Sequence, residues 1–212
     1  MKDIFTIFVE GIADEVFFKQ YLHHLFGITV PANRIQKLDG WTNLKGLTWQ
    51  QRMRTNSANG GTNIVIIDAD TDIEARRADI LSWKQQHELE FELFLLPNNQ
   101  DAGALEDLLE NIINPNNRPI MDCWEDYEKE LVKLDIPGRT PPPLTTPAKK
   151  TKIYGYLEAL LGTSKREKEL IKEKERDYEN TLHWNLDAEY LEPLKDFLIS
   201  HLGINGKETL DT

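Results

Sequence analysis

The sequence predicts an α/β protein in which a mostly parallel sheet is flanked by helices. Apolar runs of strand length, such as residues 4–9 and 63–67, alternate along the first half of the chain with segments of helical periodicity. Gly, Asn and Pro residues mark most of the boundaries between these segments. Such an alternation is typical of parallel strands joined by right-handed helical crossovers.

Each expected strand is followed by an expected helix. The strands are short and largely apolar, and they cover residues 4–9, 35–38, 63–67 and 90–96. The helices carry apolar residues at helical spacing, and they cover residues 14–26, 42–55, 73–86 and 103–113. Gly27 ends the first helix as a C-cap, and Asn114-Pro115 stops the fourth. Residues 1–118 are therefore expected to form one Rossmann-like α/β core.

The pattern changes after residue 118. Residues 137–147 contain five of the ten prolines, so we expect a loop or lid there. Helical segments are expected around it, at residues 122–134, 149–161, 165–176 and 191–202. The run 165–176 mixes basic and acidic residues and indicates a solvated helix. We expect residues 119–212 to be a helical extension packed on the core.

Composition excludes several classes of protein. A net charge of −11 argues against strong binding of nucleic acid by this chain alone, although bound cations can offset such a charge. Cys123 is the only cysteine, which excludes an internal disulfide framework and a cysteine-based zinc site. No apolar run approaches the ~20 residues that cross a bilayer, and no signal peptide is evident. We therefore expect a cytoplasmic protein without a membrane partner.

Acidic residues follow three of the expected strands. Glu10 follows the first strand, with Asp14 in the first turn of the next helix, and Asp68 and Asp70 follow the third strand. Glu106 begins the helix after the fourth strand. Parallel strands gather their carboxyl ends at one sheet edge, and crowded carboxylates are costly unless a cation neutralises them. The sequence therefore predicts a Mg²⁺ site, with Mn²⁺ as an alternative metal.

Phosphoryl-transfer chemistry fits this donor set. Five carboxylates exceed what one Mg²⁺ takes from a protein, and two cations about 4 Å apart would clamp the attacking and leaving oxygens of a phosphodiester. A cationic side chain near the phosphate would complete such a site, and the candidates are Lys149, Lys150 and Lys152. The residues alone leave open whether one or two metals bind.

These motifs resemble the Toprim domain, which topoisomerases, primases, recombination mediators and OLD-family nucleases share. The matching residues are a hydrophobic strand followed by Glu10-Gly11-x-x-Asp14, and Asp68-x-Asp70 after a second hydrophobic strand. The later segments Leu95-Leu96-Pro97 and Gly103 to Leu109 are closer to OLD-type and stand-alone Toprim-like proteins. The resemblance covers roughly the first half of the chain, and it implies a Toprim-like fold.

The resemblance also implies roles for individual residues. In the nuclease branch, the five carboxylates would ligate or position divalent metals, and a downstream lysine, which we assign to Lys152, would contact the phosphate. In the topoisomerase and primase branches, Glu10 would act as a general acid and base. The chain departs from the family because it has no room for a nucleophilic tyrosine domain and no P-loop. A separate ATPase subunit is therefore the expected partner, together with nucleic acid.

Several interpretations compete. The leading one is a metal-dependent nuclease that hydrolyses DNA or RNA, and the second is a Toprim-fold binding or regulatory module without catalysis. The third is a phosphatase or phosphotransferase with Asp68 as nucleophile, for which supporting Ser/Thr and Lys motifs are missing. A generic Rossmann-like domain is the alternative for the fold. Glu106 and Asp107 would equally serve a helix N-terminus electrostatically. The oligomeric state is open.

Overall fold

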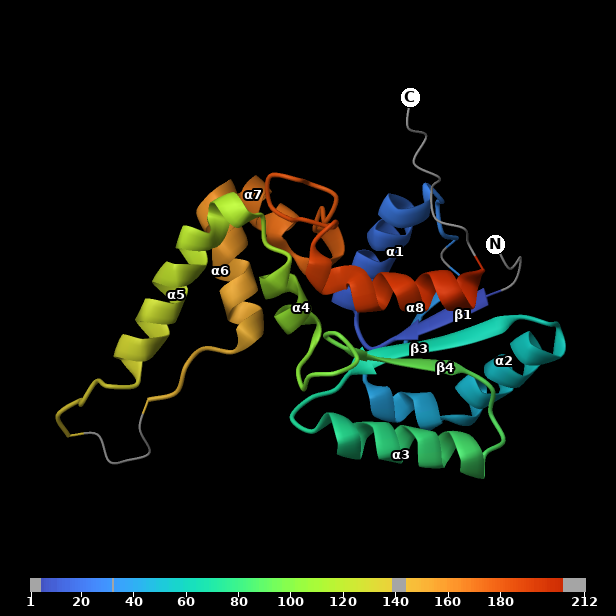
Figure 1. Cartoon of the computed structure of the whole chain (residues 1–212). Helices are drawn as coiled ribbons and strands as arrows, with labels where there is room; N and C mark the ends of the chain where they lie inside the picture. Colours follow the sequence, from blue (N-terminus) through green and yellow to red (C-terminus); the bar gives the residue numbers. More distant parts are fainter. Residues whose placement is uncertain (1–4, 32, 139–143, 204–212) are drawn as a thin grey trace.

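A four-stranded, all-parallel sheet forms the centre of the molecule (Figure 1). The computed structural model describes residues 5–31, 33–138 and 144–203. The strands are β1 (Phe5–Val9), β2 (Ile35–Lys37), β3 (Thr62–Asp68) and β4 (Glu92–Leu96), in the spatial order β2-β1-β3-β4. The expected α/β fold with a parallel sheet and a C-terminal helix is confirmed. Ile4 of the first expected strand and residues 139–143 of the expected loop lie outside the described residues.

Eight α-helices surround the sheet in the described part of the chain. Four belong to the first half: α1 (Ile12–Phe26), α2 (Leu47–Ala58), α3 (Ile73–Gln86) and α4 (Leu105–Asn111). Four follow: α5 (Arg118–Leu131), α6 (Lys149–Leu161), α7 (Lys165–Ile171) and α8 (Glu192–Leu202). Short 3₁₀ turns lie at Trp41–Lys45, Pro115–Asn117, Glu173–Glu175 and Glu189–Leu191.

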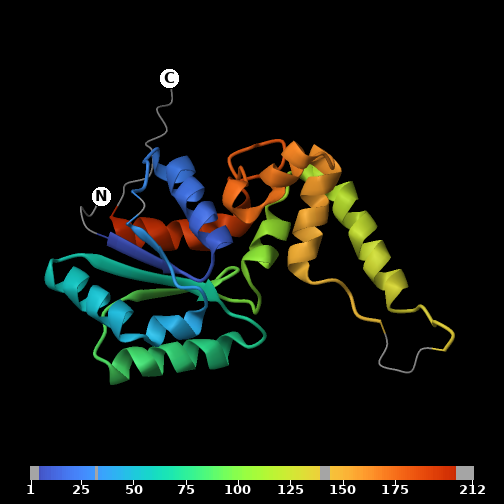
Figure 2. The same cartoon turned by 180° about the vertical axis from the view of Figure 1, so that it is seen from behind.

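Side-chain alternation along the strands divides the core into two layers. Ile7 and Ile66 belong to one apolar cluster, which also contains residues of α1, α4, α6 and α8. Phe8 and Val65 belong to the other, which contains residues of α2 and α3. Successive strand residues point to opposite faces, so β1, β3 and β4 contribute to both layers. The views show α1 and α8 on one face and α2 and α3 on the other (Figures 1 and 2).

Two expected helix starts were wrong, and glycines explain both. Residues 42–55 were expected as one helix, but Gly46 adopts an extended backbone (φ −67°, ψ 145°), which separates a 3₁₀ turn from α2. Gly103 was expected to begin a helix, but its φ of 145° is outside the helical region, and α4 begins at Leu105. The expected helix at 122–134 lies four residues earlier, at α5, with Pro119 in its first turn.

The second half of the chain returns to the sheet only in part. Helix α8 lies across the same sheet face as α1, whereas α5 and α6 form a hairpin that projects away from the sheet (Figures 1 and 2). The division of the chain at residue 118 stays a prediction. Within the described ranges, no helix is both long enough and apolar enough to cross a bilayer.

Strand order determines where a site can form. The chain runs from β1 outward to β2, and then crosses back to β3 on the other side of β1. A crevice for ligands forms where the connections of neighbouring strands diverge in this way, at their carboxyl ends. Val9 pairs with Ile66, so Glu10 and Asp68 leave the adjacent strands β1 and β3 at this point.

Candidate metal centre

Glu10 and Asp68 are held together at the ends of β1 and β3. The backbone N–H of Asp68 donates to Glu10 Oε2 at 3.4 Å, and the backbone N–H of Trp41 donates to Glu10 Oε1 at 3.3 Å. Asp68 Oδ1 in turn accepts from the backbone N–H of Leu105, the first residue of α4, at 3.1 Å. These contacts join β1, β3 and α4 through two carboxylates, as the expected strand-end arrangement requires.

Asp14 adds a third carboxylate from the first turn of α1. Its Oδ2 accepts from the backbone N–H of Gly11 at 2.9 Å, which satisfies a free donor at the helix N-terminus. Its Oδ1 is buried and has no hydrogen-bond partner in the described part of the protein, and the residue is 6% exposed. A buried polar atom without a partner costs free energy, so this oxygen indicates a missing partner.

Electrostatics places Glu106 with these three residues. Burial, together with the charges of Glu10 and Glu106 and against the Gly11 and Asp14 backbone hydrogen bonds, raises the pKa of Asp14 to about 7. Burial raises the pKa of Asp68 to about 8, with further contributions from Asp14, Glu10 and Glu106. Each of these carboxylates therefore lies within the field of the others. At neutral pH, Asp68 is therefore mostly protonated and Asp14 is about half protonated.

Glu106 and Asp107 have different partners, although they are adjacent. Asp107 Oδ2 accepts from the backbone N–H of Ala104 at 2.8 Å and so caps α4, while its Oδ1 pairs with Lys149. Glu106 instead contributes to the electrostatic field at Asp14 and Asp68. The helix-terminus interpretation therefore describes Asp107, and Glu106 belongs with the strand-end carboxylates.

Asp70 is turned toward a different partner. We expected Asp70 to lie with Asp68 at the same edge of the sheet. Strand β3 ends at Asp68, however, and the φ of Asp70 is 56°, in the left-handed region. Its backbone N–H donates to Gly103 O at 2.9 Å, and its carboxylate forms an ion pair with Arg76 of α3. The structure therefore brings Glu10, Asp14, Asp68 and Glu106 together and leaves Asp70 at the margin.

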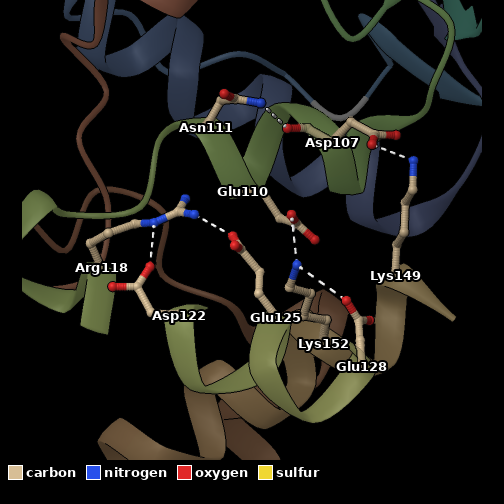
Figure 3. Close-up of polar contacts among 9 residues, drawn as sticks. All are labelled: Asp107, Glu110, Asn111, Arg118, Asp122, Glu125, Glu128, Lys149 and Lys152. Atoms are coloured by element: carbon tan, nitrogen blue, oxygen red, sulfur yellow. Dashed lines mark hydrogen bonds and ion pairs between the residues drawn. The ribbon is translucent and has the colours of Figure 1, made fainter. Parts of the chain in front are cut away.

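The three candidate lysines of α6 pair with different carboxylates, and Figure 3 draws two of them, Lys149 and Lys152. Lys152 is 7% exposed and pairs with Glu110 of α4 at 3.1 Å and with Glu128 of α5 at 3.9 Å. Lys149 pairs with Asp107 (Figure 3). Lys150 pairs with Glu173, which raises its pKa, and Glu106 adds a smaller contribution. Lys152, the residue we assigned to the phosphate, thus ties three helices together, and Lys150 lies within the field of Glu106.

Sequence reasoning missed a buried cation, Arg176. Arg176 was expected on a solvated helix, but α7 ends at Ile171 and Arg176 is 3% exposed. Its Nε donates to Ile171 O at 2.9 Å, and its Cζ lies 4.7 Å from the centre of the Tyr154 ring. Burial raises the pKa of Tyr178 to about 12, with Arg176 lowering it and Asp14 raising it. No periodicity in the charged run distinguishes Arg176 from its exposed neighbours.

The donor set fits Mg²⁺ or Mn²⁺ in chemistry. All four gathered groups are carboxylates, the hard oxygen ligands that these cations prefer, and Asp14 Oδ1 lacks a partner. Across residues 5–31, 33–138 and 144–203, however, no three Asp, Glu, His or Cys side chains are arranged so that they could hold a metal ion. Side-chain rotation would therefore accompany binding at this edge.

Comparison with known proteins identifies a family without identifying an activity. No curated protein and no solved structure matches the chain. One family model, described as a protein of unknown function (DUF3226), matches residues 5–202, which is nearly the whole chain. The sheet, the acidic edge and the projecting hairpin all lie within this match. The chain therefore belongs to the DUF3226 family of proteins of unknown function.

Proposed function

We propose that this protein is a Toprim-like, Mg²⁺-dependent phosphoryl-transfer enzyme, and that it is a nuclease acting on phosphodiester bonds of DNA or RNA. The observation that carries the proposal is the buried oxygen of Asp14 without a partner, within a group of four mutually repelling carboxylates at the carboxyl edge of a parallel sheet. Such a group is unfavourable by itself and is stabilised by a divalent cation.

The chain supplies the parts of such a site from four segments. Glu10, Asp14, Asp68 and Glu106 would hold the metal, and Asp70 would join them after leaving Arg76. A bound divalent metal activates a water molecule and stabilises the leaving oxyanion of a phosphodiester. Glu10 would also exchange a proton as general acid and base. Among the α6 lysines, Lys149 and Lys150 stay the candidates for the phosphate contact, because Lys152 is buried between Glu110 and Glu128.

A second candidate function is a binding or regulatory module without catalysis. The observation in its favour is that the carboxylates do not yet stand as metal ligands, while Asp70 is already neutralised by Arg76. The net charge of −11 also opposes tight binding of nucleic acid by this chain alone. In this case, the acidic edge would bind metal weakly, and a partner such as a separate ATPase subunit would complete it.

Calorimetric titration of the full chain with Mn²⁺ tests the metal site first. We expect binding by the wild type, and loss of at least tenfold in affinity in Asp68→Asn and in Asp14→Asn, which keep the shape of the side chain. Glu74→Gln is the matched control, because Glu74 is an exposed carboxylate in the first turn of α3. It should bind Mn²⁺ within twofold of the wild type.

Cleavage assays then separate the two candidate functions. We expect Mn²⁺-dependent hydrolysis of single- or double-stranded oligonucleotides by the wild type and Glu74→Gln, and none by Asp68→Asn. Metal binding without cleavage of any DNA or RNA probe would support the non-catalytic module. Equal cleavage by the wild type, Asp68→Asn and Glu10→Gln would overturn the mechanism altogether.

A further inference from the structure

Arg76 occupies an unusual position beside the acidic edge. It is the fourth residue of α3, near the positive end of the helix dipole, where a cation is electrostatically unfavourable. Its side chain is 17% exposed, whereas the side chain of its partner Asp70 is 57% exposed. The cation is therefore the covered member of this ion pair, and the carboxylate is the accessible one.

Trp41 holds the Arg76 guanidinium in place. The Cζ of Arg76 lies 4.9 Å from the centre of the Trp41 ring, and Lys45 Nζ lies 4.3 Å from it. Both distances are within the range of cation–π attraction. The backbone N–H of Trp41 also donates to Glu10 Oε1. Arg76 is thus connected through one residue to the carboxylates of the proposed metal site, and it keeps this support if Asp70 moves away.

We propose that Arg76 is a phosphate-contacting residue of the acidic edge, and that Asp70 occupies its guanidinium until a divalent metal draws Asp70 away. This inference rests on the proposed function and deepens it. A guanidinium presents several donors in a planar fork, which matches the oxygens of a phosphodiester as well as those of a carboxylate. Asp70 therefore takes the place that a substrate phosphate takes in the loaded protein.

The exchange is energetically accessible. An ion pair with one half-exposed partner contributes little to stability, so a metal that recruits Asp70 has little to overcome. The Asp70 backbone is anchored by its hydrogen bond to Gly103 O, and its exposed side chain has room to change rotamer. Because Arg76 and the metal compete for one carboxylate, metal and phosphate should each increase the affinity for the other.

Metal affinity is the first test. In Mn²⁺ calorimetry of the full chain, Arg76→Gln should bind three- to tenfold more tightly than the wild type, because Asp70 is released. Arg77→Gln is the matched control, because Arg77 carries the same charge as its neighbour Arg76 but donates to Asn99 O at 2.9 Å. It should stay within twofold. In an Asp70→Asn background, Arg76→Gln should add nothing.

Phosphate contact is the second test, with a fluorescent twelve-residue oligothymidylate as probe and Ca²⁺ in place of Mg²⁺. With Ca²⁺, Arg76→Gln should weaken binding at least fivefold, and Arg77→Gln less than twofold. Without Ca²⁺, Arg76→Gln should have less than a twofold effect, because Asp70 occupies the guanidinium in the wild type. A residue with a merely structural role would not show this dependence on metal.

The outcomes separate this inference from the proposed function. Equal Mn²⁺ affinities of Arg76→Gln and Arg77→Gln, in a chain that binds Mn²⁺ through Asp68, would overturn the Arg76 exchange alone. Absence of metal-dependent oligonucleotide binding by the wild type would overturn the phosphate contact. Absence of Mn²⁺ binding by the wild type and by Arg76→Gln would overturn both the inference and the proposed metal site.

Discussion

Two clusters of charged residues, one at the sheet edge and one between α4, α5 and α6, are built in opposite ways. At the sheet edge, Glu10, Asp14, Asp68 and Glu106 share one field, and burial and repulsion raise the pKa values of Asp14 and Asp68. On the hairpin side, the buried amine of Lys152 pairs with two glutamates, Glu110 and Glu128 (Figure 3). The second cluster contains its own cation, whereas Asp14 Oδ1 in the first has no hydrogen-bond partner among the described residues.

This difference distinguishes a structural cluster from a proposed functional one. Charges that hold helices together are neutralised within the chain, because an uncompensated buried charge costs several kcal/mol. The sheet-edge cluster is different. The pKa of Asp68 is raised, and Asp14 Oδ1 has no partner among the described residues, so this cluster can bind a cation from solution. Perturbed pKa values of this kind are common at functional sites. The sequence predicts one site that contains Lys152 and the strand-end carboxylates. In the structure, Lys152 pairs with Glu110 and Glu128 instead.

The largest expected effect is a stabilisation by Asp68→Asn at pH 7 without metal. A pKa of about 8 means that Asp68 stays protonated in the folded chain while it ionises in the unfolded chain, which costs stability. A neutral amide removes this cost, so we expect the free energy of unfolding to rise by about 2–4 kcal/mol. Urea unfolding measures it. Glu74→Gln should stay within about 0.5 kcal/mol of the wild type.

A loss of stability is expected, in contrast, when Lys152 loses its charge. Lys152→Met keeps the length of the side chain but leaves Glu110 and Glu128 without their cation. We expect a loss of about 2–3 kcal/mol in urea unfolding, with Mn²⁺ affinity within twofold of the wild type. If Lys152→Met instead left stability unchanged and abolished cleavage, Lys152 would belong to the catalytic site and the comparison of the two clusters would fail.

The sequence predicts features that depend on local signals, but it does not predict contacts between residues far apart in the chain. Strand-end carboxylates were predictable, because parallel strands place Glu10 and Asp68 at one edge whatever the loops do. Asp70 was not, since one left-handed residue redirects its side chain, and an ion pair with Arg76 depends on where α3 begins. The partners of Lys152, Glu110 and Glu128, lie 42 and 24 residues away in the chain. Helical periodicity predicts that one face of a helix is buried, but it does not predict which residues cover that face.

A continuous effect is expected as the pH changes. Below pH 4, Asp14 and Asp68 are protonated in both the folded and the unfolded chain. Between that value and about 7–8, only the unfolded chain loses these protons, so stability falls as the pH rises. The expected slope is about 1.4 kcal/mol per pH unit for each carboxyl that stays protonated.

Metal and substitution should both flatten that slope. Millimolar Mg²⁺ binds the ionised carboxylates of the folded chain and should restore stability near pH 8. The Asp14→Asn/Asp68→Asn double variant should lose most of the slope, and it should no longer respond to Mg²⁺. A wild-type chain whose stability is the same at pH 5 and pH 7.5 without metal would show that the acidic edge is already neutralised.

The smallest expected effect concerns Lys149, which sharpens the contrast with Lys152 within one helix. Its side chain is 57% exposed, and its ion pair with Asp107 is open to solvent, so water replaces the lost interaction. Lys149→Ala should therefore cost no more than about 0.5 kcal/mol in urea unfolding. Asp107→Ala should cost about 1 kcal/mol more, because Asp107 also caps α4 through Ala104. If Lys149→Ala and Lys152→Met lowered the free energy of unfolding equally, burial would not explain the strength of these ion pairs. Charge pairing would then stabilise the hairpin along its whole length.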